Sequence, residues 1–145
     1  FLNMLNKKNF YINGKWVKPD SEKEIKVINP ANEDVCTLIT LGNKKDIHTA
    51  VSAAKEAFKL WGYSSKEERI DYLEKLYTLY KQRWDDFTNA IVLEMGAPKE
   101  FASKLQVGAG AAHIKSFIKY LKEFNFDKPL NDHLANQRII YEPKG

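Results

Sequence analysis

The segment that decides the fold reads Phe10-Tyr11-Ile12-Asn13-Gly14-Lys15-Trp16-Val17. Aromatic and β-branched residues flank its central Asn-Gly pair, and these two residue types tolerate the positive φ of a type I′ turn. The pattern predicts a short β-hairpin. Residues 24–28 and 35–41 are also strand-like, and the turn-forming run Asn29-Pro30-Ala31-Asn32 separates them. The first forty residues are therefore predicted to form β ribbons.

Beyond residue 41 the apolar residues recur at steps of three and four, which is the period of an amphipathic α-helix. The first helix is predicted from Asp46 to Leu60, with Gly62 as the glycine that ends it. The second helix is predicted to begin at Ser65, because Ser65 and Glu68 have the spacing of a capping box. Helices therefore follow the ribbons.

The second predicted helix carries a long apolar stripe from Ile70 to Ile91. Its steps alternate between three and four residues, as in a coiled-coil seam, so a helical protein-interaction module is the alternative function. Several members are large aromatic residues, which pack poorly in a dimeric coiled coil and suit the core of a larger domain. A core stripe is therefore preferred. The stripe consists of Ile70, Leu73, Tyr77, Tyr80, Trp84, Phe87 and Ile91.

A third helix is predicted from Pro98 to Phe124, after Gly96 has ended the second with a positive φ. Gly108 and Gly110 lie inside it, and each costs about 0.5–1 kcal/mol relative to alanine. We therefore expect another backbone to pass close to them. A dinucleotide-binding turn is disfavoured, because the third glycine of that fingerprint is missing and no strand precedes it. A last strand is predicted at residues 137–141.

The composition is that of a water-soluble globular protein. Of the 145 residues, 43% are hydrophobic and 29% are charged, and no run approaches the roughly 18 apolar residues of a membrane span. The net charge is +4, but lysines and acids are interspersed, so neither a nucleic-acid partner nor a membrane partner is expected. A single cysteine, and a first segment (residues 1–8) unlike a secretory signal, favour a cytoplasmic location.

No constellation of catalytic residues is visible in the sequence. Cys36 lies in a strand-like run without a neighbouring histidine, lysine or helix start to favour the thiolate, so we expect a small buried apolar residue. His48, His113 and His133 share no ligand spacing, which disfavours a zinc site. The adjacent acids Asp85-Asp86 point about 100° apart on a helix and do not converge on one substrate atom.

The order of the motifs resembles the opening of the NAD(P)-dependent aldehyde dehydrogenases. The hairpin is followed by Val27-Ile28-Asn29-Pro30-Ala31, Leu93-Glu94-Met95-Gly96-Ala97-Pro98 and Arg138-Ile139-Ile140-Tyr141-Glu142-Pro143-Lys144-Gly145. The resemblance implies an α/β fold with N-terminal β ribbons followed by three long helices, an incomplete part of a Rossmann-type cofactor-binding domain. Residues 1–127 would form the N-terminal part of the NAD(P)-binding domain, and residues 128–145 the start of the oligomerisation arm and return strand.

The resemblance also implies what the complete protein does. Members of the family oxidise an aldehyde to a carboxylic acid through a cysteine thiohemiacetal and thioester, with NAD or NADP as the cofactor. The family's catalytic cysteine, asparagine and glutamate and its glycine-rich cofactor turns match no residue of this sequence, Cys36 included. We therefore expect a truncated fragment of a homo-oligomeric enzyme, inactive alone and binding no cofactor tightly.

One modest site is carried over by the resemblance. Some family members bind a monovalent cation, K+ or Na+, between two main-chain carbonyls before the Asn-Pro pair and an acid before the glycine of the inter-helix turn. The matching residues here are Val27, Ile28 and Glu94. Carbonyl and carboxylate oxygens are the ligands that such an ion requires. The alternative for Glu94 is a helix-end carboxylate without a ligand role.

Overall fold

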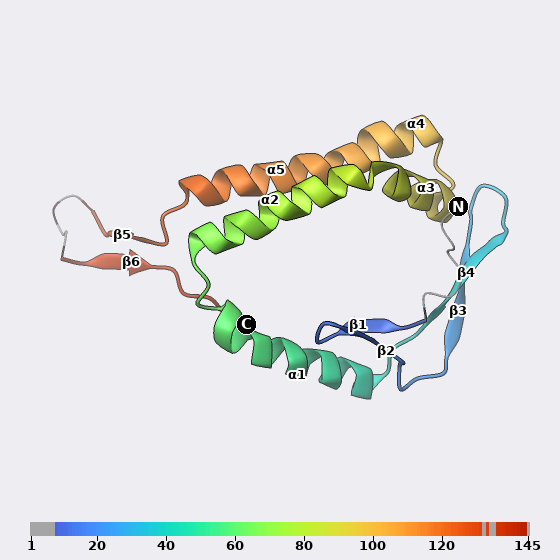
Figure 1. The fold of residues 1–145 in the computed structure, drawn as a ribbon, viewed down its shortest axis with the longest axis horizontal. Coiled ribbons are helices and arrows are strands. Elements are labelled where there is room, and N and C mark those ends of the chain that lie inside the picture. The colour runs from blue at the N-terminus through green and yellow to red at the C-terminus, as the bar shows by residue number, and fades with distance from the viewer. Residues whose placement is uncertain (1–7, 132, 134–135, 145) are drawn as a thin grey trace.

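The computed structural model describes residues 8–131, 133 and 136–144. Two layers face each other and are joined at both ends (Figure 1). One layer contains the long helices of residues 66–123, and the other contains the helix of residues 44–61 with the first ribbon. Residues 1–7, which carry most of the segment predicted to be unlike a secretory signal, lie outside the described residues.

The first two strands form the predicted hairpin. β1 (Phe10–Ile12) pairs antiparallel with β2 (Lys15–Val17). Asn13 and Gly14 between them have φ values of 52° and 74°. Positive φ at both central positions is what a type I′ turn requires, so the hairpin prediction is confirmed.

The next two strands form a second ribbon. β3 (Glu24–Ile28) pairs antiparallel with β4 (Val35–Thr40), close to the predicted ranges. Within the described part of the chain every sheet has two strands, each paired with its neighbour in sequence. The β part of the molecule is therefore a set of separate ribbons, as the sequence predicts.

Helix α1 (Lys44–Trp61) begins two residues before its predicted start. Asn43 caps it, because its side chain accepts hydrogen bonds from the amides of Lys45 and Asp46 while the Asp46 carboxylate accepts from the Asn43 amide. This capping box uses Asn and Asp in place of the usual Ser or Thr and Glu, which is why the sequence pattern missed it. Gly62 has a φ of −55°, so it ends the helix without a left-handed conformation.

The second predicted helix is two helices, α2 (Lys66–Gln82) and α3 (Trp84–Met95). Arg83 separates them with a φ of −103° and a ψ of 23°, outside the α-helical region. The cap at Ser65 is present, since its hydroxyl accepts from the Glu68 amide over 3.0 Å. An uninterrupted helix through residue 91 is therefore a wrong prediction, and the break disrupts any coiled-coil seam along it.

The third predicted helix is continuous but not uniform. It runs through α4 (Lys99–Phe101), the π-helical segment η1 (Ala102–Val107) and α5 (Gly108–Glu123). α5 lies alongside α2 (Figure 1), and the stripe residues of α2, namely Ile70, Leu73, Tyr77 and Tyr80, are half-buried. This packing agrees with a core role for the stripe rather than a partner-binding role.

The close approach expected at the two helical glycines exists at only one of them, and it comes from a side chain. A Cβ on Gly110 would lie 2.3 Å from the Tyr80 hydroxyl oxygen, whereas the nearest atom to one on Gly108 is 3.9 Å away. The Tyr80 hydroxyl donates to the carbonyl oxygen of Val107 over 3.1 Å. Gly110 therefore makes room for a tyrosine of α2, not for the backbone that was predicted.

A third ribbon projects from the body at one end of the molecule (Figure 1). β5 (Asp127–Pro129) pairs antiparallel with β6 (Arg138–Ile140). β6 lies within the predicted last strand. β5 was not predicted, because Asp and Pro are poor strand formers.

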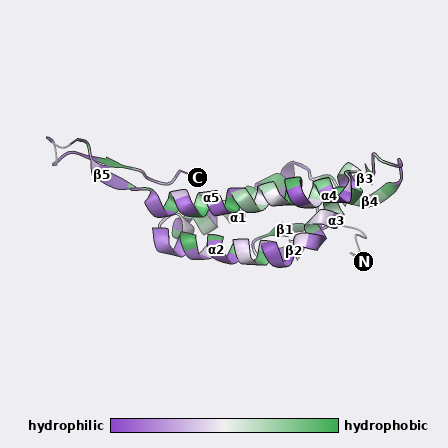
Figure 2. Cartoon of the chain, turned by 90° about the horizontal axis from the view of Figure 1, so that it is seen from above, coloured by the Kyte–Doolittle hydropathy of each residue, from purple (hydrophilic) through white to green (hydrophobic). Residues whose placement is uncertain are grey.

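Few apolar side chains are buried. The chain exposes 11,388 Å², whereas a folded monomer of 16.8 kDa exposes about 7,700 Å². Hydrophobic residues are spread along the helices from end to end (Figure 2). None of the described helices has both the length and the apolar character needed to cross a bilayer. The buried apolar residues of the described chain are Ala102, Val107, Ala111 and Ile118.

Candidate functional site

Cys36 occupies a β-bulge in the second ribbon. The pairing of β3 with β4 shifts between Val27 and Ile28, which leaves Cys36 as the extra residue on β4. Its thiol reaches α3, where Sγ donates to the main-chain oxygen of Leu93 over 3.3 Å. The expectation of a buried apolar residue is therefore corrected, because Cys36 is half-buried and hydrogen-bonded to a helix carbonyl.

The end of α3 touches the turn between β3 and β4. Gly96 follows α3 with a φ of 64°, the left-handed conformation that was predicted. A Cβ at this position would lie 2.7 Å from the amide nitrogen of Ala31, so the turn leaves room only for glycine. The side-chain oxygen of Asn29 accepts from the same amide over 2.9 Å and holds the turn in shape. The last turn of α3 is thereby fixed against the ribbon.

This contact places the residues of the predicted cation site on touching elements. Val27 and Ile28 lie on β3 just before the turn, and Glu94 lies in the last turn of α3 with its side chain exposed. In the part of the chain that the structure describes, no three His, Cys, Asp or Glu side chains gather as metal ligands. A cation here would therefore depend on main-chain oxygens and a single carboxylate.

The remaining titratable candidates have structural surroundings. His48 and His113 are exposed on α1 and α5, and His133 is exposed in the loop after β5. Asp86 of the predicted acid pair bonds Arg83 over 3.0 Å. Burial raises the pKa of Tyr80, which keeps its hydroxyl protonated as a hydrogen-bond donor. These groups form no shared centre.

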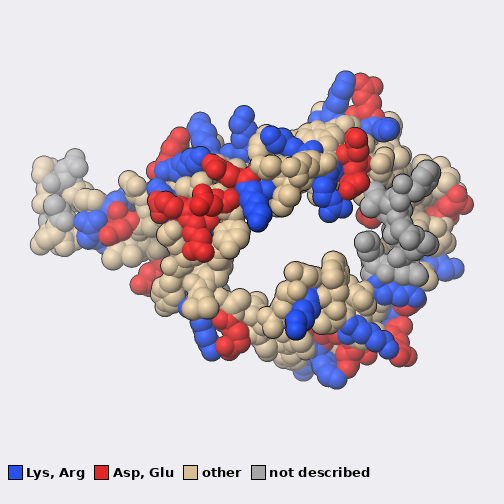
Figure 3. Space-filling view, in the orientation of Figure 1, with Lys and Arg blue, Asp and Glu red and all other residues tan. Residues whose placement is uncertain are grey.

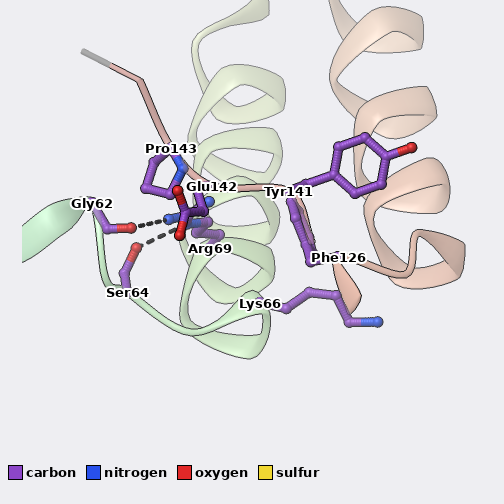
Figure 4. A pocket seen from close by; sticks show the side chains of 8 residues that line it. All are labelled: Gly62, Ser64, Lys66, Arg69, Phe126, Tyr141, Glu142 and Pro143. Atoms are coloured by element: carbon purple, nitrogen blue, oxygen red, sulfur yellow. Dashed lines mark hydrogen bonds between the residues drawn. The ribbon is translucent and has the colours of Figure 1, made fainter. Parts of the chain in front are cut away.

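A pocket of about 380 Å³ lies where the third ribbon joins the body (Figure 4). Its most polar wall is built by Arg69 of α2. The guanidinium donates from Nε to Ser64 Oγ over 2.8 Å and from Nη2 to the Gly62 carbonyl oxygen over 3.0 Å. The other lining residues are Lys66, Phe126, Tyr141, Glu142 and Pro143.

A second cation at this pocket joins α2 to the end of α5. Lys66 Nζ donates to the carbonyl oxygens of Lys122 and Phe124, 3.1 and 3.4 Å away. The Phe124 ring packs edge to face on Phe126 and on Tyr141, whose amide bonds the Phe126 carbonyl over 2.8 Å. Both cations donate to oxygens of the chain and so hold neighbouring segments together. The pocket is a structural joint.

Sequence reasoning missed this joint, although a signal for it was present. Lys66 and Arg69 place two cations in or next to the first turn of α2, where the helix dipole disfavours positive charge. Such a placement indicates that the cations serve partners outside their own helix.

The apolar face of α1 is largely exposed. Of its 18 residues, only Asp46 is buried. Ile47 is 61% exposed, and Val51 and Trp61 are each 46% exposed. An opening separates the layer of α1 from the layer of α2 and α5 (Figure 3). We call the following residues the α1 stripe: Ile47, Ala50, Val51, Ala54, Phe58 and Trp61.

Comparison with known proteins gives consistent matches. The chain matches the model of the aldehyde dehydrogenase family over residues 16–145. It is 36% identical over 143 residues to the 3-succinoylsemialdehyde-pyridine dehydrogenase of a Pseudomonas species. That match covers 98% of this chain and 29% of the relative.

Two solved structures contain the same fold. An aldehyde dehydrogenase from Bartonella henselae matches with a TM-score of 0.86 and 41% identity, over 88% of this chain and 27% of that chain. Aldehyde dehydrogenase C from Pseudomonas syringae, solved with NAD+ and octanal, matches with a TM-score of 0.82 and 34% identity, over 86% and 26%. The chain thus spans less than a third of the length of these relatives.

Proposed function

Because the chain belongs to the aldehyde dehydrogenase family, we propose that it acts as the N-terminal scaffold of the cofactor-binding domain of such an oxidoreductase. In this role the ribbons and helices position other parts of the domain and carry no catalytic group themselves. The complete protein oxidises an aldehyde to a carboxylic acid with NAD+ or NADP+. The NAD+ and octanal in the Pseudomonas syringae structure support both the cofactor and the substrate class.

The uncovered surface carries this proposal. The chain exposes about 3,700 Å² more than a self-contained domain of its mass would. Obligate interfaces bury about 2,000–5,000 Å² in total, or about 1,000–2,500 Å² on each partner, so the excess on this one chain is at least as large as one side of a permanent contact. A domain part that is stable only against further structure is expected to have such a surface.

A covalent fusion tests the proposal. This chain would be joined to the part of the Bartonella henselae aldehyde dehydrogenase that the match does not cover, and NADH or NADPH formation from octanal would be followed by absorbance. We expect turnover by the fusion and none by the 145-residue chain alone. A soluble fusion without activity, or turnover by the chain alone that Cys36→Ser abolishes, would contradict the proposal.

We propose that residues 128–145 begin an oligomerisation arm and that the complete protein is a homo-oligomer. The projecting ribbon supports this, because β6 is an edge strand and Ile140 on it is 62% exposed. Light scattering at micromolar concentration is expected to show association of the chain, and a clean monomer would oppose it.

A cytoplasmic location is proposed as well, since a lone cysteine suits a reducing compartment.

We also propose a K+ or Na+ site formed by the main-chain oxygens of Val27 and Ile28 with the Glu94 carboxylate. The contact of Gly96 with the β3–β4 turn supports it, because that contact holds the two elements together. Thermal unfolding in KCl, compared with tetramethylammonium chloride at equal ionic strength, tests the site. We expect a higher Tm in KCl that Glu94→Gln removes, and equal values in the two salts would oppose the site.

A further inference from the structure

The tip of the first hairpin places a main-chain nitrogen next to a side-chain carboxamide that nothing shields. Asn13 and Gly14 form this tip, and no other asparagine of the sequence is followed by glycine. Both residues are exposed, and nothing lies within 4 Å of the position that a Cβ of Gly14 would take. Among the described residues, no hydrogen bond holds the Asn13 carboxamide or the Gly14 amide. Water and hydroxide therefore reach both groups.

We propose that Asn13 is a site of spontaneous deamidation, a covalent modification that changes the hairpin as the protein ages. The inference does not depend on the proposed function. Hydroxide removes the proton of the Gly14 amide, and this nitrogen then forms a bond to Cγ of Asn13. The Cγ–Nδ2 bond breaks, and ammonia leaves after taking a proton from water, which restores the hydroxide. The product is a succinimide ring that joins the two residues.

Water then opens the succinimide at either of its carbonyl carbons. Opening at Cγ gives an aspartate, whereas opening at the main-chain carbonyl gives an isoaspartate, in which the backbone runs through the former side chain. Overall one water is consumed and one ammonia is released, and no group is oxidised or reduced. Both products carry a carboxylate at a position where Asn13 is neutral.

Other asparagines near the ribbons lack these conditions. Asn29 precedes Pro30, whose nitrogen carries no proton that hydroxide could remove. The carboxamides of Asn32 and Asn43 each donate to the carboxylate of a neighbouring aspartate, over 2.7 and 2.8 Å. Their side chains are therefore held away from the attacking nitrogen. Asn13 combines an unrestrained carboxamide with a following glycine.

The small size of the ribbon lets the turn reach the reactive geometry. The Gly14 nitrogen must approach Cγ of Asn13, so the turn has to leave its folded conformation briefly. β1 and β2 have three residues each, and an isolated two-stranded ribbon is marginally stable in water. Segments with few buried contacts open locally at a small fraction of the free energy of global unfolding. The hairpin tip therefore opens often while the rest of the chain stays folded.

The modification has a structural consequence for the ribbon. An isoaspartate lengthens the backbone of the turn by one methylene. The two-residue turn sets Ile12 opposite Lys15, and a longer turn no longer fits that register. The rings of Tyr11 and Trp16, which meet edge to face with centroids 5.2 Å apart, are paired by the same register. Formation of isoaspartate should therefore separate these two rings.

Peptide mapping of the whole chain tests the inference. Trypsin releases residues 9–15 as one peptide, which contains both Asn9 and Asn13. Asn9 is also exposed, but Phe10 follows it, and the Cβ of Phe10 crowds the nitrogen that would attack. Asn9 is therefore an internal control. The folded chain and a synthetic peptide of residues 9–15 are incubated in the same mildly alkaline buffer, and mass spectrometry follows conversion at each asparagine.

We expect Asn13 to convert at least about tenfold faster than Asn9, because glycine has no Cβ to shield the attacking nitrogen. The rate at Asn13 in the folded chain should lie within about thirtyfold of the rate in the free peptide, because the ribbon opens at a small free-energy cost. A greater slowing in the folded chain, or equal conversion of the two asparagines, would overturn the inference.

A matched variant tests the effect on the hairpin. Asn13→Gly removes the carboxamide and keeps a residue that tolerates the positive φ of the turn. In the parent chain, conversion should add a more acidic form on ion exchange, and that form should lose the near-UV circular dichroism of the Tyr11–Trp16 pair. Asn13→Gly should keep this signal through the same incubation. An acidic form with an unchanged ring signal, or an equal loss in Asn13→Gly, would overturn the effect on the ribbon.

Discussion

A small network of hydrogen bonds fixes the start of α1 against the segment that follows β2. The Asp46 carboxylate accepts from the amides of Asp20 and Asn43 over 2.8 and 2.9 Å. Asp20 in turn accepts from Lys45 and from the Asn43 side chain. The amide of Asp20 is the main cause that lowers the pKa of Asp46, and Lys45 is the main cause that lowers the pKa of Asp20. The network ties the segment after β2 to the helix start.

These lowered pKa values give the network a defined pH dependence. A carboxyl with a lower pKa in the folded state contributes stability above its unfolded pKa of about 3.9, and the contribution is lost as pH falls through the folded pKa. We expect the urea midpoint to drop between pH 5 and pH 3, and Asp46→Asn to drop less. Glu56→Gln, which removes only the exposed pair with Lys59, is the control. Equal drops in the parent and in Asp46→Asn would contradict this role.

A comparison of Gly14 with Gly96 distinguishes the cost of backbone strain from the cost of a steric clash. Gly14 and Gly96 have φ values of 74° and 64°, but only Gly96 has neighbours where a Cβ would lie. Gly14→Ala should cost about 1–2 kcal/mol for the left-handed conformation alone. Gly96→Ala should cost more, because its Cβ meets the Ala31 amide at 2.7 Å. Urea unfolding of both variants measures the difference, and equal costs would mean that the β3–β4 turn yields freely.

Among the secondary-structure elements, the contact of α2 with the helical run of residues 99–123 is the most specific. The Tyr80 hydroxyl satisfies the Val107 carbonyl at the end of the π-helical segment. The Trp84 indole donates to Ser103 Oγ over 2.9 Å within the same segment. The Tyr80 hydroxyl, from α2, and the Trp84 indole, from α3, therefore anchor the π-helical segment η1 at two places.

A double-mutant cycle tests the pairing of Tyr80 with Gly110. Gly110→Ala alone should destabilise the chain, because its Cβ would lie 2.3 Å from the Tyr80 hydroxyl. In a Tyr80→Ala background, Gly110→Ala should instead stabilise by about 0.5–1 kcal/mol, the helix-propensity gain of alanine over glycine. Guanidinium unfolding of the four chains measures the coupling. Additive effects would show that the phenol moves aside at no cost.

What the sequence could predict also differs between elements. The Asn-Gly hairpin and the glycine at residue 96 are set by local φ preferences, so both were predictable. The break at Arg83 and the π-helical turn were not, because the apolar period runs on through both and neither glycine nor proline marks the first. The residues of the predicted cation site lie on touching elements because the chain is folded back on itself. The joint at Lys66 and Arg69 depends on the end of α5, more than fifty residues away.

For the whole molecule, the small buried core has a direct consequence for denaturation. The urea m-value scales with the area exposed on unfolding, and small proteins give about 1–3 kcal/mol/M. Because the folded chain already exposes 11,388 Å², we expect an m-value near the low end of that range. Urea titration followed by circular dichroism measures it. A value at the high end would mean that the chain in solution buries far more surface than the structure shows.

Within the described residues, the helical layer contacts the rest of the chain near its two ends, at α1 and at the turn between β3 and β4. At one end Trp61 touches Tyr72, and at the other Gly96 touches Ala31, with the opening between them (Figure 3). Cooperative melting requires a core that every element shares, whereas the buried apolar residues of the described chain, Ala102, Val107, Ala111 and Ile118, all lie in the helical layer. On heating, the α1 layer should therefore lose its structure at a lower temperature than α2 and α5, as two separate calorimetric transitions.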